Sequence, residues 1–231
     1  MLGPVYCETG HPWFGIAEPV NFITNAFIIV AAGFAAEYVA KSPHRRDAGP
    51  WLLVGLLLLT GIGSFLWHGL RTPFTLALDT WSGILFLITL IWLWVGALYG
   101  RAAGFLGSVG FVAAAVGSLA LSFRLMTAAT PAARPLMFAP FFLTVVAAGT
   151  WLVRATWRKA GIGTARWGMA ALVCGLIAAA GRSADLPLCH AIPFGTHFAW
   201  HTFLSLAAYL SIVMLVRLTP IATDEAHPAR H

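Results

Sequence analysis

The sequence predicts an all-α protein: a bundle of seven transmembrane helices with the N-terminus outside the membrane and the C-terminus in the cytoplasm. Three observations lead to this prediction. Hydrophobic residues make up 59% of the 231 residues and charged residues only 10%. In a soluble domain, about a quarter of all residues are charged. Seven apolar segments are long enough to cross a bilayer core, which takes roughly 20 apolar residues. The basic residues are divided unevenly between the two sides of these segments.

The segments follow one another with short polar connections. Residues 1–18 come first and form a polar, aromatic extracytoplasmic stretch that glycine and proline interrupt. The sixth segment is short and rich in small residues, which favour close packing between membrane helices. Residues 218–231 are predicted as a polar cytoplasmic tail, so the membrane domain covers residues 19–217. The predicted spans are 19–40, 50–70, 75–99, 103–123, 135–153, 167–182 and 196–216.

Lysine and arginine predict the orientation, because short cytoplasmic loops are enriched in these residues. With the N-terminus outside, ten of the 14 basic residues fall on the cytoplasmic side and four on the outer side. The net charge of +6 is therefore interpreted as a sign of topology, and its scatter along the chain argues against a nucleic-acid-binding surface. We expect an integral multi-pass protein of the plasma membrane, the inner membrane or an internal membrane.

Five polar side chains are predicted to meet at the outer side of the membrane. Ser64 and His68 lie four residues apart near the end of the second span, and His197 and His201 repeat this spacing at the start of the last span. Residues four apart share one face of a helix. Asp79 lies near the start of the third span. In the predicted topology all five positions fall at one depth.

Three histidines are typical of a catalytic zinc site, in which water takes the fourth position. His68, His197 and His201 are the predicted ligands, and zinc lowers the pKa of a bound water to about 7. Asp79 is suited to accept the proton of the attacking water and pass it to a leaving amine. Ser64 is suited to hydrogen-bond the scissile carbonyl oxygen or a water. The pattern predicts hydrolysis of a carbonyl compound in or near the membrane, with the site toward the extracytoplasmic side.

Structural roles compete with each of these assignments. A histidine at a helix end can simply occupy the interface, although ionisable residues inside membrane segments are usually functional. Ser64 can bond a carbonyl of its own helix, and Asp79 can pair with Arg71 or cap its helix. His190 is an alternative ligand, but it has no partner at helical spacing.

The motifs resemble those of the alkaline ceramidases. The likeness includes SxxxH, an aspartate eleven residues after that histidine and HxxxH in the last span, together with YCE, EPVNFITN and DLPLCHAIPFGTHFAWH. These enzymes belong to a superfamily of seven-helix membrane hydrolases with the adiponectin/progestin receptors and GPI-lipid remodelling proteins. The resemblance implies zinc on His68, His197 and His201, with Ser64 and Asp79 assisting amide hydrolysis. The implied substrate is a ceramide-like N-acyl sphingoid lipid, which is cleaved to a fatty acid and a sphingoid base.

The same resemblance raises the question of calcium, which the eukaryotic ceramidases bind through an acidic stretch before the first helix. Glu8 and Glu18 match that stretch, whereas Val5 stands where an aspartate is expected and Gly10 stands near an expected asparagine. Calcium prefers six to eight oxygen ligands, so two carboxylates leave the site incomplete. The alternative role of Glu18 is to cap the first helix.

The sequence leaves two other functions open. The same zinc chemistry would attack either an ester or an amide, so hydrolysis of an ester-linked or GPI-type lipid is one alternative. A seven-helix receptor without catalytic activity is the other. Those receptors usually carry a sizeable polar N-terminal region, and here about 17 residues precede the first span.

The outer side of the predicted topology also contains two of the three cysteines. Cys7 and Cys189 are expected to pair if the outer compartment is oxidising, and two free thiols are the alternative. Cys174 lies inside the sixth span and is interpreted as a packing residue. Arg182 and Asp185 come shortly before the last span and are expected to form an ion pair.

Overall fold

A computed structural model describes residues 3–128 and 139–219, which form eight α-helices. The first two are consecutive and make one span from Pro19 to Ala40, so seven spans are long and apolar enough to cross a membrane. The all-α fold class and the number of spans are therefore confirmed, and the orientation stays a prediction. The helices are α1 (Pro19–Thr24), α2 (Ala26–Ala40), α3 (Ala48–Leu70), α4 (Pro73–Tyr99), α5 (Arg101–Ala128), α6 (Ala139–Ala160), α7 (Ile162–Leu188) and α8 (His197–Leu218).

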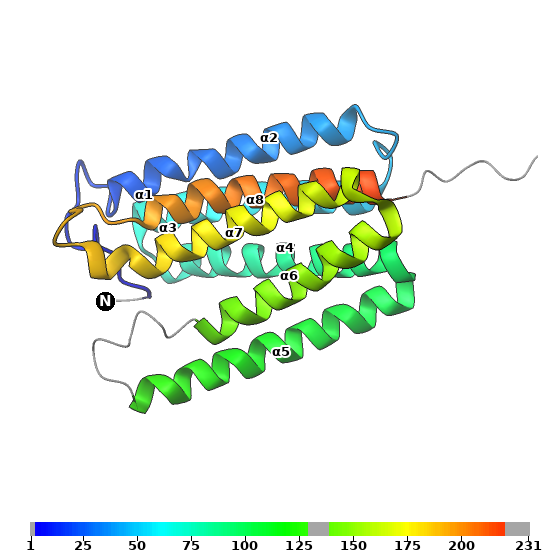
Figure 1. The fold of residues 1–231 in the computed structure, drawn as a ribbon. Coiled ribbons are helices and arrows are strands. Elements are labelled where there is room, and N and C mark those ends of the chain that lie inside the picture. Colours follow the sequence, from blue (N-terminus) through cyan, green and yellow to red (C-terminus); the bar gives the residue numbers. More distant parts are fainter. Residues whose placement is uncertain (1–2, 129–138, 220–231) are drawn as a thin grey trace, which may run out of the picture.

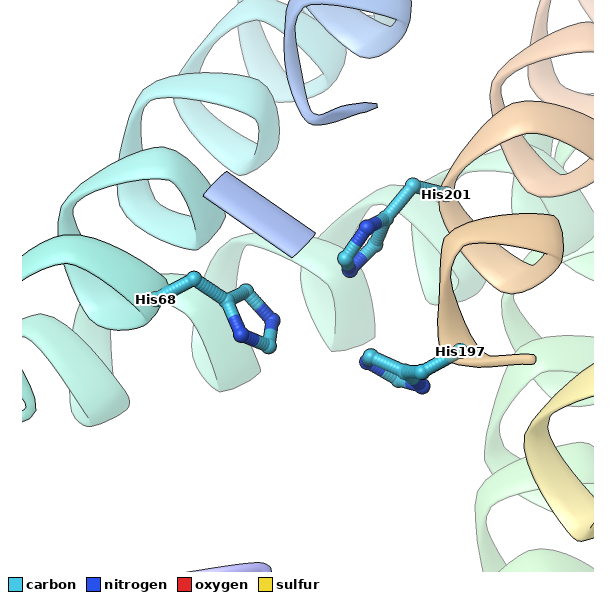
Figure 2. Close-up of side chains that lie close together, drawn as sticks. All are labelled: His68, His197 and His201. Carbon is cyan, nitrogen blue, oxygen red and sulfur yellow. The ribbon is translucent and has the colours of Figure 1, made fainter. Parts of the chain in front are cut away.

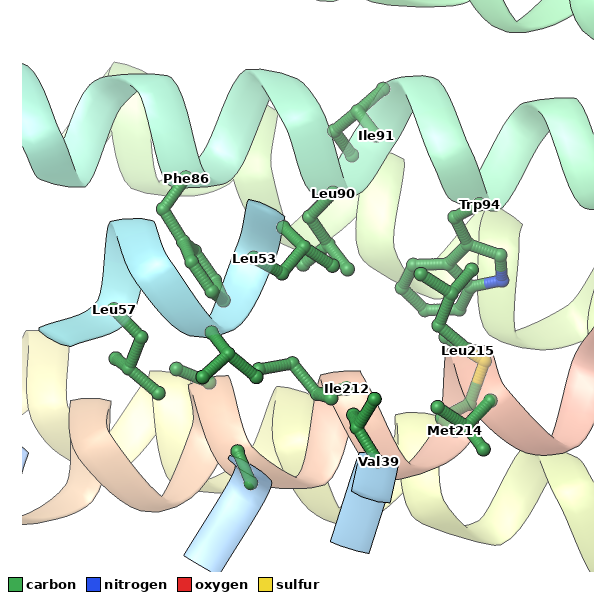
Figure 3. Close-up of a cluster of buried hydrophobic side chains, with 14 of the residues drawn as sticks. Val39, Leu53, Leu57, Phe86, Leu90, Ile91, Trp94, Ile212, Met214 and Leu215 are labelled. Atoms are coloured by element: carbon green, nitrogen blue, oxygen red, sulfur yellow. The ribbon is translucent and has the colours of Figure 1, made fainter. Parts of the chain in front are cut away.

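Helix α8 lies at the centre of the bundle and packs against α2, α3, α4 and α7, while α5 and α6 lie at one side (Figure 1). Of the residues in the most apolar stretch of α8, 61% are buried, compared with 17% in the corresponding stretch of α5. Its Ile212, Met214 and Leu215 meet side chains of α2, α3 and α4 in the apolar core (Figure 3). Large apolar side chains such as Trp92 and Leu106 are exposed on the outside of the bundle. An exposed apolar surface of this kind is typical of contact with lipid.

The structure corrects the predicted boundaries of the fifth and sixth spans. Helix α6 continues to Ala160 and α7 begins at Ile162, so the predicted loop between them shrinks to Gly161. Gly161 has φ +76°, a conformation that glycine adopts without steric cost and that permits this tight connection. The sequence suggested a loop because Arg154 and its basic neighbours interrupt the apolar pattern. Long basic side chains reach water from a helix end, so they do not end the helix. The predicted start of the fifth span at residue 135 lies outside the described residues.

Helix α7 also continues further than predicted, through Pro187 to Leu188. This extension places Asp185 on the helix and not in a loop. The Asp185 carboxylate accepts hydrogen bonds from the backbone N–H groups of Thr196 and His197, at 2.8 and 2.9 Å. The first N–H groups of a helix have no partner within it. Asp185 therefore caps α8 from a neighbouring helix, at the end that carries the histidines.

The N-terminal segment lies across the same end of the bundle (Figure 1). Its Cys7 is joined to Cys189 in a disulfide with the Cα atoms 5.4 Å apart, and its Cys7 N–H donates to Asp185. Gly195 lies beneath this junction with φ +69°, and a Cβ there would come within 2.8 Å of the Cys7 Cβ. Only glycine fits both the backbone conformation and the space. The junction ties the N-terminal segment to the connection between α7 and α8.

This junction predicts that non-reducing peptide mapping will recover Cys7 linked to Cys189 in protein taken from an oxidising compartment. Because the two residues are separated by 182 positions, the bridge closes a long loop. Removing it with Cys7→Ser and Cys189→Ser is expected to lower the free energy of unfolding by about 2–4 kcal/mol. Cys174→Ser, which changes the free cysteine of α7, is the matched control. Two free thiols at positions 7 and 189 would contradict the prediction.

Candidate metal centre

Three histidines from two helices converge at the end of the bundle that the N-terminal segment covers. His68 comes from the last turn of α3, and His197 and His201 come from the first two turns of α8 (Figure 2). All three are at most 2% exposed, and one ring nitrogen from each lies within 4.8 Å of the other two. The spacing of four residues predicted that His197 and His201 share a face. The structure adds that this face is turned toward His68.

Glu18 orients His68. The His68 Nδ1 lies 2.5 Å from the Glu18 Oε2, and Arg71 donates to the other carboxylate oxygen at 2.9 Å. Burial raises the pKa of Glu18, while its contacts with Thr9 and Arg71 act in the opposite direction. A histidine that donates from Nδ1 keeps the lone pair on Nε2 for a metal. Glu18 therefore directs His68 Nε2 into the centre.

Thr24 orients His201 in the same way. The Thr24 hydroxyl has one hydrogen, which it donates to the Val20 carbonyl oxygen at 2.8 Å. Thr24 Oγ1 also lies 3.0 Å from His201 Nδ1, so it accepts the hydrogen of that nitrogen. The lone pair of His201 is thereby placed on Nε2, which is buried without a hydrogen-bond partner among the described residues. Sequence reasoning missed Thr24, because threonine is common in membrane helices and its partner is 177 positions away.

Tyr6 covers His197 on the side of the N-terminal segment. The two rings are stacked with their centroids 4.1 Å apart, and the Tyr6 ring is 5.1 Å from that of His68. Burial raises the pKa of Tyr6 to about 12, so the phenol stays neutral at physiological pH. Arg182 lies over the same tyrosine ring, with its guanidinium carbon 4.7 Å from the ring centroid. The sequence marked YCE as a motif but did not assign a role to Tyr6.

The three histidines fit a zinc ion. Three neutral imidazoles with one open position are the usual protein ligands of catalytic zinc. His197 Nδ1 and His201 Nε2 are buried nitrogens without a hydrogen-bond partner in residues 3–128 and 139–219. Buried polar atoms without partners are costly, and a cation would satisfy those that face the centre.

Glu8 and Glu18 do not fit a calcium ion. The two Glu8 oxygens accept from the backbone N–H groups of Val20 and Asn21, both at 2.8 Å, and so cap α1. Burial raises the pKa of Glu8, and these two N–H donors oppose the shift. Both Glu18 oxygens already face the donors of Thr9, His68 and Arg71. A calcium ion needs six to eight oxygen ligands and would meet hydrogen-bond donors here.

Ser64 and Asp79 lie side by side where α3 and α4 come into contact. The Ser64 hydroxyl hydrogen-bonds the Asp79 carboxylate, and Ser64 lies one helical turn from His68. The helices approach closely at Gly63, where a Cβ would come within 2.7 Å of the Asp79 backbone nitrogen. The sequence predicted that Asp79 and Ser64 would lie at one depth. The glycine that lets them touch received no role in that prediction.

Ser64 and Asp79 also line an apolar cavity of about 410 Å³ between α3, α4, α6, α7 and α8. This volume lies within the ~300–1,000 Å³ range of ligand sites. Apart from the Asp79 carboxylate and a few hydroxyl groups, such as that of Ser64, the lining is mainly hydrocarbon, with Leu57, Phe86 and Leu90 as examples. The cavity is suited to a hydrocarbon chain whose polar end lies beside the carboxylate.

Two lesser expectations are corrected. Arg182 and Asp185 form no ion pair in the described part of the chain, because Asp185 accepts three backbone hydrogen bonds and Arg182 packs on Tyr6. His190 is exposed, and its Nδ1 lies 3.1 Å from the Pro187 carbonyl oxygen. It is not part of the cluster of histidines.

One of two comparisons with known proteins places the chain in a family. A search among curated proteins finds no match. The profile of one protein family, described as Ceramidase, matches residues 6–230, which is nearly the whole chain. The match includes Glu18, the three histidines, Ser64 and Asp79. The chain therefore belongs to the ceramidase family.

Proposed function

We propose that this protein is a zinc-dependent amide hydrolase that cleaves ceramide-like N-acyl sphingoid lipids to a fatty acid and a sphingoid base. The observation that carries the proposal is the convergence of three buried histidines beside a Ser64–Asp79 pair that lines an apolar cavity. Membership of the ceramidase family supports a ceramide as the substrate. The predicted orientation would place this reaction toward the extracytoplasmic side of the membrane.

His68, His197 and His201 would hold the zinc ion. When bound, zinc would supply Lewis acidity, which activates water as a nucleophile at neutral pH. Glu18 and Thr24 act on this site as positioning residues, since each occupies the Nδ1 of one histidine. Such outer partners fix the ring orientation and raise the basicity of the ligand.

Asp79 would move the proton. The attacking water loses a proton to the Asp79 carboxylate as its oxygen bonds to the amide carbon. When the C–N bond breaks, the leaving nitrogen takes that proton, and the products are a carboxylic acid and an amine. The Ser64 hydroxyl keeps the carboxylate in position through its hydrogen bond. From its position one turn from His68 on α3, the hydroxyl would also be suited to bond the amide oxygen.

The proposal predicts that purified protein will release fatty acid and sphingoid base from a ceramide, as measured by mass spectrometry of the lipid products. Asp79→Asn keeps the size of the side chain but removes the proton acceptor. It is expected to lower the rate by about 10²–10⁴ while the zinc content is unchanged. Asp47→Asn, at the opposite end of α3, is the control, because Asp47 is exposed and bonds only His44 among the described residues.

Two outcomes would overturn this assignment. Turnover in Asp79→Asn equal to that of the wild type would exclude Asp79 as the base. Hydrolysis of an ester-linked analogue, with no hydrolysis of any ceramide tested, would replace the amide reaction with that of a lipid esterase.

A second prediction concerns the metal. Purified protein should contain one zinc ion per chain, and His68→Ala, His197→Ala and His201→Ala should each lose most of it, because each removes one of three ligands. Elemental analysis measures the content directly. His190→Ala is the matched control, since this histidine lies at the same end of the bundle but is exposed and outside the cluster. Wild-type zinc content in all three variants would refute the site.

A third prediction concerns Glu18. Glu18→Gln keeps the shape of the side chain but weakens its hold on His68 Nδ1. The affinity for zinc, measured by competition with a chelator, is expected to fall about 10–100-fold. Glu37→Gln serves as the control, because Glu37 forms an exposed ion pair with Lys41 at the other end of the same span. An unchanged affinity in Glu18→Gln would show that Glu18 is not needed to position the ligand.

A further inference from the structure

The cavity beside Ser64 and Asp79 has a defined end. Along α4 its lining runs from Asp79 to Trp94, which at the helical rise of 1.5 Å per residue is about 22 Å. A bilayer core is about 30 Å thick, so this length exceeds the half that the chains of one leaflet occupy. A fully extended hydrocarbon chain with its polar end at Asp79 would therefore reach toward Trp94.

Trp94 is held rigidly at this end. Its indole N–H donates to the Thr156 hydroxyl at 2.8 Å, and both side chains are buried. The Thr156 hydrogen is in turn donated to the Leu152 carbonyl oxygen at 2.9 Å, so the hydroxyl oxygen is oriented to accept. A buried indole needs such a partner for its N–H. The hydrogen bond restricts the rotation of the ring, which lines the cavity.

The helix opposite is shaped around the ring. A Cβ at Gly168 of α7 would come within 3.3 Å of the Trp94 Cη2 and within 3.2 Å of the Val153 Cγ2. Trp94, Gly168 and Val153 all line the cavity, so three helices meet at its end. Figure 3 shows Trp94 projecting from α4 toward α8, next to Leu215. Of these two side chains only Trp94 lines the cavity, so the indole lies at the border between the cavity and the part of the core that contains Leu215.

We propose that Trp94, held by Thr156, sets the maximum length of the hydrocarbon chain that the cavity accepts. The residue is a determinant of substrate specificity and takes no part in the chemistry. The inference rests on the proposed function in one respect: the chain belongs to the lipid that is cleaved beside Asp79. The chain can be the acyl or the sphingoid chain, which are alike in their chemistry along this length.

The test compares kcat/KM for two series of ceramides, one varying the acyl chain and one the sphingoid chain. One methylene more or less in an apolar pocket changes kcat/KM by about 10–200-fold, so the wild type should show an upper limit of chain length in one series. Trp94→Ala should move that limit to longer chains. Trp94→Phe should move it less, because the smaller ring keeps most of the core filled. Thr156→Val, which releases the indole, should blunt the limit.

Trp92→Ala is the matched control. Trp92 is on the same helix, two residues away, but is 44% exposed on the outside of the bundle. It should keep the wild-type limit. Thermal unfolding in detergent identifies any variant that is misfolded, and Trp94→Phe and Thr156→Val cover the case in which Trp94→Ala does not fold.

A second readout separates this inference from the proposed function. Free fatty acids of increasing length should raise the melting temperature up to a limit, and that limit should be longer in Trp94→Ala than in the wild type. This measurement needs no turnover. If no ceramide is cleaved, the proposed function fails. The melting temperatures with fatty acids of increasing length still test the role of Trp94 in that case. Limits that are identical in the wild type and in folded Trp94 variants, in both lipid series and in the fatty-acid series, would overturn the inference. An equal shift in Trp92→Ala would overturn it as well.

Discussion

The hydrogen bond between Glu18 and His68 is the interaction on which the rest of the site depends. It joins the start of α1 to the end of α3, two positions that are 50 residues apart in the chain. A carboxylate without partners would be very costly in this buried place, so Glu18 is held on both oxygens, by Arg71 and Thr9 as well as by His68. The same contacts that make the burial of Glu18 tolerable also determine which nitrogen of His68 is free for a metal.

Near this bond, α1 and α8 both begin with backbone N–H groups that have no partner within their own helix. Glu8 caps α1 and Asp185 caps α8, and both carboxylates come from other segments of the chain. The first N–H groups of a helix and a buried carboxylate supply each other with hydrogen-bond partners. The Glu8 cap thereby attaches the N-terminal segment to the site, and the Asp185 cap attaches α7 to it. With the Cys7–Cys189 disulfide, these contacts form a polar layer at one end of an apolar bundle. The histidines lie at the boundary between the two.

That boundary is also what makes the site suitable for a lipid. Below the polar layer, the cavity that starts at Ser64 and Asp79 is lined mainly by hydrocarbon and ends at Trp94. A lipid can place its amide at the polar end and a chain at the apolar end without leaving the bilayer environment. In such an apolar surrounding, charges and hydrogen bonds act more strongly than in water.

The sequence by itself determined the class of fold and the composition of the candidate centre. Spans of about 20 apolar residues predict seven helices whatever their packing, because a bilayer requires that length. The spacing of four residues put His197 and His201 on one face, and the order of the spans brought His68 to the same end. Only the tertiary structure decided the partners: Glu18 meets His68, and Asp185 meets the start of α8 and not Arg182. Hydrogen bonds between residues far apart depend on how the helices pack, and a pattern read along one chain contains no record of that packing.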